Sequence, residues 1–408
     1  MDFPCNSHTF QNGIRLVHTQ VLHSVVTHCG YFIHVGSRDE DTTETGMAHF
    51  IEHCFFKGTK KRKPYHILSS LDSYGGELNA YTAKEETCLY ATIPHGIFDK
   101  AVDVLSDILF CSEFPNKEIE KEKAVIIDEI QAYLDSPSEQ IFDDFENLIF
   151  QGHSLGQSIL GTPEHLQSFN QEKIKTFLER NYHASRIVFS YVGPLALEKV
   201  IKKLSAFVEL YPWASKSEPR ISFENYQAKF VQEKKDTHQA HCMMGGIAYP
   251  YSHNKRLALT LLNHLLGGNS LNNRLNLNIR EKYGFTYNIE SNYTPYSDTG
   301  YFSVYFGTDK KYLKRLQDLV HKELFKLQTP FTDLQLQRLK NQFKGSLLLA
   351  QESLGALMIS QAKSFVLYNK MDSLADTFQR IDAVVALDLQ EVAQELFEKN
   401  KMSTLIFS

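Results

Sequence analysis

The sequence contains no long hydrophobic run and no basic leader. A helix that crosses a membrane needs about 20 consecutive apolar residues, and no stretch approaches that length. The N-terminal residues MDFPCNSH lack the basic start and apolar centre of a secretory signal, and they lack the Arg-rich, acid-poor character of a mitochondrial transit peptide. We therefore expect a cytoplasmic protein, although a chain whose signal had been removed would look the same.

A strong charge imbalance and paired cysteines are also absent. With 43 Lys and Arg against 48 Asp and Glu, the formal net charge is −5. This charge gives no electrostatic reason to expect nucleic acid or an anionic membrane as a partner. None of the 6 cysteines belongs to a C-x-x-C pair or to a metal-ligand spacing. The pattern predicts free, mostly buried thiols in a reducing compartment.

The length of the chain and its patterning indicate two domains. A chain of 408 residues exceeds what one hydrophobic core usually serves. The stretch 211–225 begins with a polar segment that holds two prolines and breaks the hydrophobic periodicity. We predict that this stretch is a linker between a domain at 1–210 and a domain at 226–408.

Strand and helix patterns alternate along the first half, which predicts an α+β fold with mostly antiparallel sheets packed with helices. There we predict helices at 46–56, 65–74, 97–111, 118–134, 138–149, 171–182 and 195–210, and strands at 31–35, 78–82, 88–93 and 186–192. In the second half we predict helices at 331–351 and 354–368 and a closing strand at 403–407. This half reads as a degenerate copy of the first, because His241-Cys242 echoes His28-Cys29.

The segment His49-Phe50-Ile51-Glu52-His53 carries the clearest chemical signal. Residues three and four apart on a helix are neighbours, so His49 and His53 can bind one metal ion. Glu52 lies between them, close enough to act on a water molecule at that ion. This order, H-x-x-E-H, is that of inverted zinc peptidases, in which the glutamate is the general base. The alternative is a helix with two solvated or core histidines.

A site of this kind needs a third ligand, and the helical stretch at 117–130 offers one. Glu129 lies in its apolar run, where a carboxylate is costly to bury unless a metal or another partner compensates it. Glu122 precedes it by seven residues, two turns along the same helix face. Glu122 can therefore reach the same site without being a ligand.

These residues and their spacing resemble the inverted-zincin metallopeptidases, the family of pitrilysin, insulysin and the mitochondrial processing peptidase. In that family the motif is followed by a glutamate about 76 residues later, as Glu129 follows His53, and another glutamate precedes that ligand by seven residues, as Glu122 does. Four further segments match the family's first domain, namely Phe56–Thr59, Gly75–Thr82, Leu160–Thr162 and Tyr182–Arg186. From about residue 8 to the C-terminus, the chain resembles a single short-subunit member of about 400 residues.

The resemblance implies a zinc-dependent endopeptidase that hydrolyses peptides or unfolded polypeptide segments. It implies one Zn²⁺ per chain, held by His49, His53 and Glu129, with Glu52 as general base and Glu122 as support. It also implies that the strand around Gly76, Asn79 and Ala80 is an edge strand to which an extended substrate adds by backbone hydrogen bonds.

A second group, Arg280 and Tyr287, follows a glycine-containing segment in the second half. That segment lacks the Gly-Lys-Ser/Thr ending of a phosphate-binding loop. Taken alone, the two residues predict only a surface ion pair and a strand aromatic. In the family, an arginine followed seven residues later by a tyrosine supports substrate and transition state near the metal. Because this chain carries both the metal motif and the pair, the resemblance implies a homodimer that encloses a clamshell chamber.

Two other functions stay open. One is a precursor-processing protease of narrow specificity, as in mitochondria. The other is a non-catalytic subunit or scaffold of the same family, but such members usually lose metal ligands or the Arg/Tyr pair.

Overall fold

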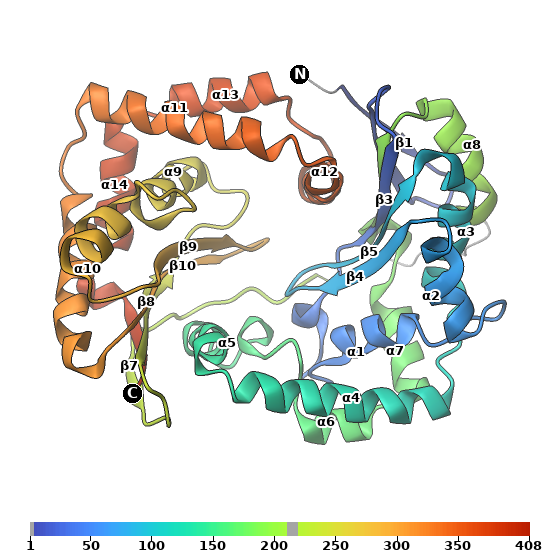
Figure 1. Cartoon of the computed structure of the whole chain (residues 1–408), viewed down its shortest axis with the longest axis horizontal. Helices are drawn as coiled ribbons and strands as arrows, with labels where there is room; N and C mark the ends of the chain where they lie inside the picture. The colour runs from blue at the N-terminus through green and yellow to red at the C-terminus, as the bar shows by residue number, and fades with distance from the viewer. Residues whose placement is uncertain (1–3, 210–218) are drawn as a thin grey trace. The chain divides into compact units, whose positions relative to one another are not determined.

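The computed structural model describes residues 4–209 and 219–408, which form two compact units (Figure 1). Unit 1 comprises the described parts of Met1–Ile130, Gln157–Arg220 and Leu349–Ala375. Unit 2 comprises Gln131–Gly156, Ile221–Leu348 and Asp376–Ser408. Each unit thus takes a segment from the other half of the chain, which the predicted contiguous domains 1–210 and 226–408 do not contain. The greater part of the predicted linker 211–225 lies outside the described residues.

Unit 1 is built on a six-stranded sheet of order β1-β2-β6-β3-β5-β4. The strands are β1 (Cys5–Thr9), β2 (Arg15–Gln20), β3 (Val26–Ile33), β4 (Glu77–Thr82), β5 (Thr87–Pro94) and β6 (Ile187–Gly193). The helices are α1 (Met47–Phe55), α2 (Pro64–Asp72), α3 (Phe98–Cys111), α4 (Asn116–Leu134, which runs on into unit 2), α6 (Pro163–Ser168), α7 (Gln171–Asn181), α8 (Leu197–Val208) and α12 (Leu354–Tyr368). Among the described strands of this sheet only the pair β2–β6 is parallel, so the predicted α+β fold with a mostly antiparallel sheet is confirmed.

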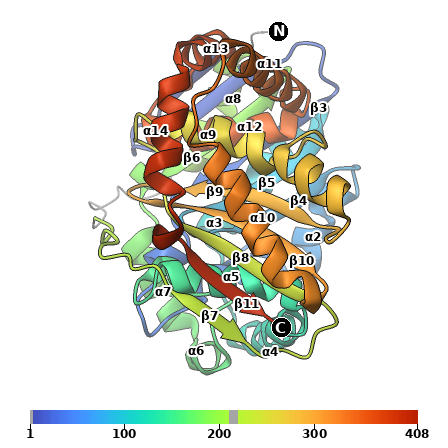
Figure 2. The ribbon, with the colours of Figure 1, turned by 90° about the vertical axis from the view of Figure 1, so that its left-hand side faces the viewer.

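Unit 2 is built on a five-stranded sheet of order β7-β11-β8-β10-β9. Its strands are β7 (Phe230–Glu233), β8 (Ala240–Ile247), β9 (Ile289–Pro295), β10 (Gly300–Thr308) and β11 (Ser403–Phe407). Its helices are α5 (Pro137–Ile149), α9 (Arg256–Gly267), α10 (Leu313–Lys326), α11 (Asp333–Ala350), α13 (Leu374–Ala383) and α14 (Ala386–Leu396). Helices α9, α10 and α14 supply one core layer against this sheet (Figure 2).

The two sheets repeat one pattern of pairing. In each sheet a parallel pair (β2–β6 or β7–β11) is followed by three antiparallel pairs in the same order. The strands β3 and β8 occupy equivalent places, and they carry His28-Cys29 and His241-Cys242. The sequence echo between the two halves therefore corresponds to a structural duplication.

Both faces of the unit 1 sheet are covered by helices. All seven residues of β6 are buried, which is expected of a strand sandwiched between two layers. On one face lies the main core with α1, α3 and α8. On the other face α12 places Ala362 and Phe365 against Phe32 and Val188. Unit 2 has the corresponding arrangement, because α5 packs on the second face of its sheet.

The beginning of α1 is fixed by a close backbone contact. Gly46 precedes the helix with φ +94, and a Cβ on it would lie 2.7 Å from the Cα of Gly161. Gly161 has φ +76, and a Cβ there would lie 2.3 Å from the carbonyl oxygen of Thr45. Neither position tolerates a side chain. The segment Leu160–Thr162, which resembles the family's first domain, therefore has a structural role, because it packs against the start of α1.

The first turn of α1 is also held by a buried carboxylate. Glu40 is 5% exposed, and it accepts hydrogen bonds from the backbone N–H groups of Gly46 (2.8 Å) and Ala48 (2.8 Å). These donors have no partner within the helix. Burial raises the pKa of Glu40 well above its ordinary value, so the two hydrogen bonds and not a full charge make the cap. Glu40 therefore caps α1 from outside the usual capping position.

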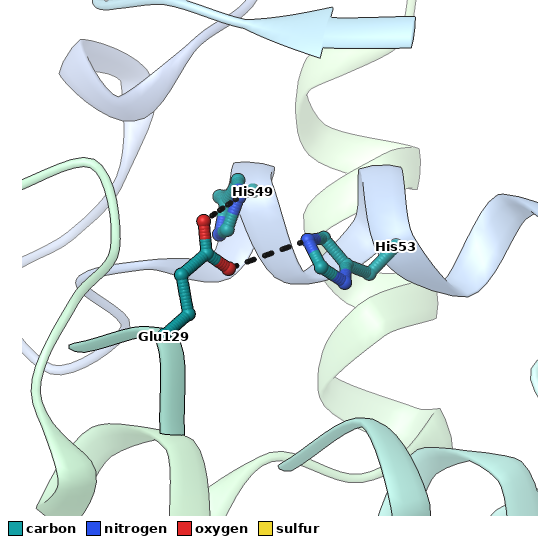
Figure 3. A group of neighbouring side chains, drawn as sticks. All are labelled: His49, His53 and Glu129. Atoms are coloured by element: carbon teal, nitrogen blue, oxygen red, sulfur yellow. Dashed lines mark ion pairs between the residues drawn. The ribbon is translucent and has the colours of Figure 1, made fainter. Parts of the chain in front are cut away.

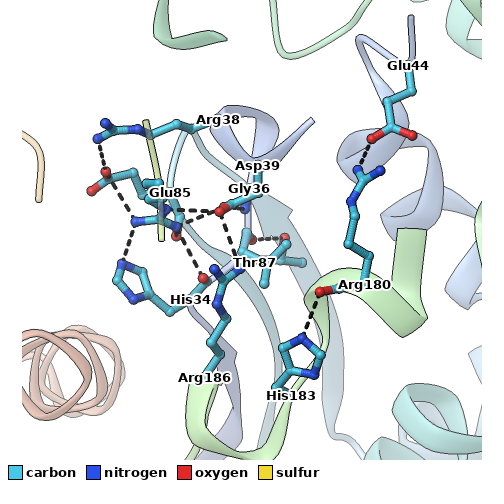
Figure 4. Close-up of polar contacts among 12 residues, drawn as sticks. His34, Gly36, Arg38, Asp39, Glu44, Glu85, Thr87, Arg180, His183 and Arg186 are labelled. Carbon is cyan, nitrogen blue, oxygen red and sulfur yellow. Dashed lines mark hydrogen bonds and ion pairs between the residues drawn. The ribbon is translucent and has the colours of Figure 1, made fainter. Parts of the chain in front are cut away.

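Buried ion pairs hold the loop between β3 and α1 (Figure 4). Arg38 pairs with Glu85 at 2.6 Å, and Asp39 pairs with Arg186 at 3.3 Å and with Arg220 at 2.8 Å. Burial alone would raise the pKa of Asp39, but the two arginines hold it below its ordinary value. Removal of one partner from such a pair would leave an uncompensated buried charge, so these pairs stabilise the loop in the conformation observed.

We predict that Glu40→Ala lowers the free energy of unfolding by about 2–3 kcal/mol, because it leaves two buried N–H groups without an acceptor. Urea unfolding measures this loss. Asp41→Ala is the matched control, since it removes an exposed ion pair with Arg180 and should cost less than about 1 kcal/mol. Equal losses in the two variants would contradict the capping role of Glu40.

Candidate metal centre

The side chains of His49, His53 and Glu129 converge in unit 1 (Figure 3). The Nε2 atom of His49 lies 4.0 Å from Oε1 of Glu129, and Nε2 of His53 lies 3.7 Å from Oε2. One ligand atom from each residue can be chosen so that all three lie within 4.8 Å of one another. The predicted ligand set is therefore assembled by two helices, α1 with the imidazoles and α4 with the carboxylate.

The two imidazoles are neighbours because they are one helical turn apart on α1. Their ring centroids are 4.6 Å apart, and the rings are inclined at 65°. Their surroundings differ, since the His49 side chain is 11% exposed and the His53 side chain 24% exposed. Burial and the neighbouring His53 lower the pKa of His49 to about 4, so this imidazole stays neutral in weakly acidic solution.

Glu122 contacts the site from behind His53. Its Oε2 lies 3.3 Å from Nδ1 of His53, and its Oε1 lies 2.7 Å from Nζ of Lys57. Because an ionised carboxylate can only accept, Nδ1 of His53 is the donor and Nε2 keeps its lone pair toward Glu129. Glu122 thus contacts His53 and is not one of the three residues that could hold a metal ion together. Sequence reasoning gave Lys57 no role, although it lies in the matching segment Phe56–Thr59.

The sequence predicts that Glu129 is buried in the apolar run of α4 and that the other charged residues of this helix face solvent. For Glu122 and Glu129 the structure shows the reverse. Glu122 is 4% exposed, whereas the Glu129 side chain is 44% exposed. The buried stripe of α4 contains Ile119, Glu122, Ile126 and Ile130, which follow a helical spacing. Glu129 lies beside this stripe and not within it. The argument that burial requires a metal at Glu129 is therefore wrong, although its position next to both imidazoles agrees with a ligand.

Glu52 lies on α1 between the two histidines and is partly buried. Burial raises its pKa above the ordinary value of a glutamate, and the charge of Glu129 acts in the same direction. A carboxylate with a raised pKa is a stronger base, which suits a group that must take a proton from water. Along α1 it directly precedes His53 and follows His49 by three residues.

The predicted substrate strand is an edge strand. Of the described strands, β4 pairs only with β5, so its other edge presents unpaired backbone groups. Asn79 and Ala80 lie in β4, and Gly76 directly precedes it. A cavity of about 560 Å³ adjoins this edge, and α2 and β4 line it with Tyr65, Leu68, Ser69, Asp72, Gly76, Glu77, Leu78 and Asn79. The free edge of β4 and this cavity therefore lie next to each other.

Arg280 and Tyr287 form a group of their own in unit 2. Arg280 lies on a π-helical turn, Asn276–Glu281, a geometry that is frequent at functional sites. Its guanidinium lies 4.9 Å from the ring centroid of Tyr287, which is 82% exposed. Both residues line a cavity of about 640 Å³ together with His238, Gln239, Glu281, Gly284, Phe285, Thr286, Asp309 and Tyr312. The phenol of Tyr287 is exposed, whereas the side chain of Arg280 is 30% exposed and its Nε lies 3.9 Å from Oε1 of Glu281.

The donor set in unit 1 fits a zinc ion. Two imidazole nitrogens and one carboxylate oxygen are the three protein ligands of many catalytic zinc sites, which keep a further position open. Because the side chain of Glu129 is 44% exposed, the three residues can be reached from solvent. The support of His53 by Glu122 is the hydrogen bond that metal-bound histidines usually make through their other nitrogen.

The lowered pKa of His49 predicts a pH dependence for the metal-free protein. Unfolding restores the ordinary value of 6.5, so the unfolded chain binds a proton more readily than the fold between about pH 6.5 and 4. The free energy of unfolding should therefore decrease as the pH is lowered through this window. Between pH 7 and 5 the loss should be about 2 kcal/mol smaller in His49→Gln than in the native protein. Urea unfolding after chelation tests this, with exposed His23→Gln as control. An identical pH response in native protein and His49→Gln would contradict it.

Comparison with known proteins agrees with this geometry. The profile of "Insulinase (Peptidase family M16)" matches residues 17–163, and that of "Peptidase M16 inactive domain" matches residues 168–343. The chain is 34% identical to "Uncharacterized zinc protease YmxG" of Bacillus subtilis (strain 168), covering 98% of this chain and 97% of the relative. It is 29% identical to "Probable mitochondrial-processing peptidase subunit beta, mitochondrial" of Arabidopsis thaliana, covering 96% of this chain and 76% of the relative.

The fold has close counterparts among solved structures. A protease from Helicobacter pylori superposes with a TM-score of 0.90 at 22% identity, over 100% of both chains. A Pseudomonas fluorescens structure described as a peptidase M16 inactive domain superposes with a TM-score of 0.91 at 16% identity, over 99% of this chain and 98% of the other. At these identities the likeness concerns the fold. The matches along the sequence go further, and they show that this chain belongs to the insulinase family of peptidases, M16.

Proposed function

We propose that this chain is a zinc-dependent endopeptidase that hydrolyses peptides or unfolded polypeptide segments. The observation that carries the proposal is the convergence of His49, His53 and Glu129 around one point, with Glu52 on the same helix as the two imidazoles. The names of its relatives, which include zinc proteases, support the same chemistry. None of the described helices combines the length and hydropathy of a membrane-spanning segment.

The three ligands would hold the zinc ion, which when bound polarises a carbonyl group and lowers the pKa of water. Glu52 takes the proton of the attacking water and can pass it to the leaving amine. Glu122 keeps His53 oriented by accepting the proton of Nδ1. The burial that strengthens Glu52 as a base also shields its side chain from bulk solvent.

Substrate would bind along the free edge of β4. Backbone hydrogen bonds to an edge strand depend little on the side chains of the peptide, so this mode supports broad specificity for extended chains. Arg280 can hold a carbonyl or carboxylate of the substrate, and Tyr287 can donate to a developing oxyanion. Both residues line one cavity, and Tyr287 is 82% exposed, which supports a role for the pair in contacts with substrate.

A precursor-processing protease of narrow specificity is the second candidate. The similarity to the β subunit of a mitochondrial processing peptidase favours it. The free edge of β4 favours broad specificity instead. Mapping the cleavage sites in a set of unfolded proteins would distinguish the two, because a processing enzyme cleaves at few positions. For a non-catalytic subunit, the expected result is no cleavage at all.

We predict that Glu52→Gln retains zinc but loses about 10²–10⁴-fold in the rate of peptide cleavage, because only the base is removed. Glu129→Gln should instead lower the zinc content, since it weakens a ligand. Zinc analysis and a quenched-peptide assay with and without chelator measure both effects. Asp128→Asn, at an exposed neighbouring position of α4, is the control. Near-normal turnover in Glu52→Gln would refute its assignment as the base.

We also propose that the active form is a homodimer that encloses a chamber. In it, His49, Glu52, His53 and Glu129 of one chain would act with the Arg/Tyr pair of the other. The presence of both groups in one chain supports a self-sufficient dimer. A closed chamber would admit only peptides or unfolded segments.

Mixing variants tests this assembly. Glu52→Gln chains and Arg280→Ala/Tyr287→Phe chains should each be nearly inactive. If the groups act in trans, a mixed dimer has one intact site, so mixing should restore part of the activity. If they act within one chain, every site keeps a defect. No recovery after verified subunit exchange would exclude the trans arrangement and leave the metal chemistry unaffected.

A further inference from the structure

Lys57 is placed by the end of the metal-binding helix. Helix α1 ends at Phe55, and the backbone N–H of Lys57 bonds to the carbonyl of Cys54 at 3.1 Å. The chain then turns at Gly58, which has φ +133. Lys57 is thus held one turn beyond His53, and its side chain is 30% exposed. A lysine in this position can bury its apolar stem while its ammonium group reaches α4.

The ammonium group of Lys57 contacts a carboxylate that is almost fully buried. Nζ of Lys57 lies 2.7 Å from Oε1 of Glu122, whose side chain is 5% exposed. The other oxygen of Glu122 faces Nδ1 of His53 at 3.3 Å. A buried carboxylate is costly unless it is paired and hydrogen-bonded. Lys57 supplies a full positive charge to one oxygen, and the second oxygen is directed to the histidine.

The two imidazoles differ in this support. His53 has Glu122 behind it, and Glu122 has Lys57 behind it. The Nδ1 atom of His49 is buried and has no hydrogen-bond partner in the described part of the chain. Of the two imidazoles, only His53 is therefore oriented by a carboxylate on its second ring nitrogen. A group that fixes Glu122 also fixes the ring plane and the proton position of His53.

We infer that Lys57 is a positioning residue for the metal centre, acting through Glu122 on His53. This inference rests on the proposed function, because it assumes that zinc binds at His49, His53 and Glu129. Lys57 touches neither a ligand nor the reacting atoms in this arrangement. Its effect is to hold the carboxylate in the one orientation that leaves Nε2 of His53 directed at the ion.

The test is a measurement of zinc affinity by competition with a chelator, together with the absorption spectrum of the cobalt-substituted protein. Lys57→Met should lower zinc affinity by about 10- to 100-fold and change the cobalt spectrum, and Lys57→Arg should recover most of both. Lys121→Met is the matched control, because Lys121 lies next to Glu122 in the sequence and pairs at the same 2.7 Å, but with Glu118 and not with Glu122. It should leave both readouts unchanged.

A second comparison shows the route of the effect. If Lys57 acts through Glu122, then Lys57→Met adds no further loss of zinc affinity in a Glu122→Gln background. If Lys57→Met does not fold, Lys57→Gln and Lys57→Arg provide the same contrast, since only the arginine keeps the charge. Native-like affinity and spectrum in Lys57→Met or Lys57→Gln would overturn the inference, as would additive losses in the double variant. Absence of zinc binding by the native protein would instead refute the proposed function.

Discussion

The meeting of α1 and α4 is the constraint on which the site depends. Two imidazoles from one helix and two carboxylates from the other must face each other in one fixed register, because a shift of either helix by a single residue turns its side chains by about 100°. Contacts at both ends of α1 hold this helix in place relative to α4. Glu40 and the Gly46–Gly161 contact fix its beginning, and the pairing of Lys57 with Glu122 ties its end to α4.

Much of this arrangement follows from local rules that a sequence makes visible. Spacings of four and seven residues put His49 beside His53 and Glu122 on the same side of α4 as Glu129. Hydrophobic periodicity located most helices of unit 1 to within a few residues, and the closing strand at Ser403–Phe407 agrees with its predicted bounds. The α+β class and the duplication also follow from such patterns, since equivalent strands carry similar residues.

Other features depend on contacts between distant segments, and no local pattern reveals them. Glu40 caps a helix that begins seven residues later, so it lies outside the usual capping motifs. The exposure of Glu129 was misjudged because the apolar run around it includes Val125, which is 49% exposed. The exchange of α5 and α12 between the halves was not predicted either. An apolar helix shows that it will be buried, but not which of two similar sheets will bury it.

The position of α12 has a consequence for how the protein is made. The strands of the unit 1 sheet are complete at Gly193, but the helix that covers its second face begins only at Leu354. At the usual rate of translation, this interval lasts on the order of ten seconds. If the sheet forms before α12 is synthesised, Phe32 and Val188 have no covering helix during that time, and an apolar face of the sheet is exposed. A chaperone that occupies this face until α12 arrives would protect the growing polypeptide from self-association on the ribosome.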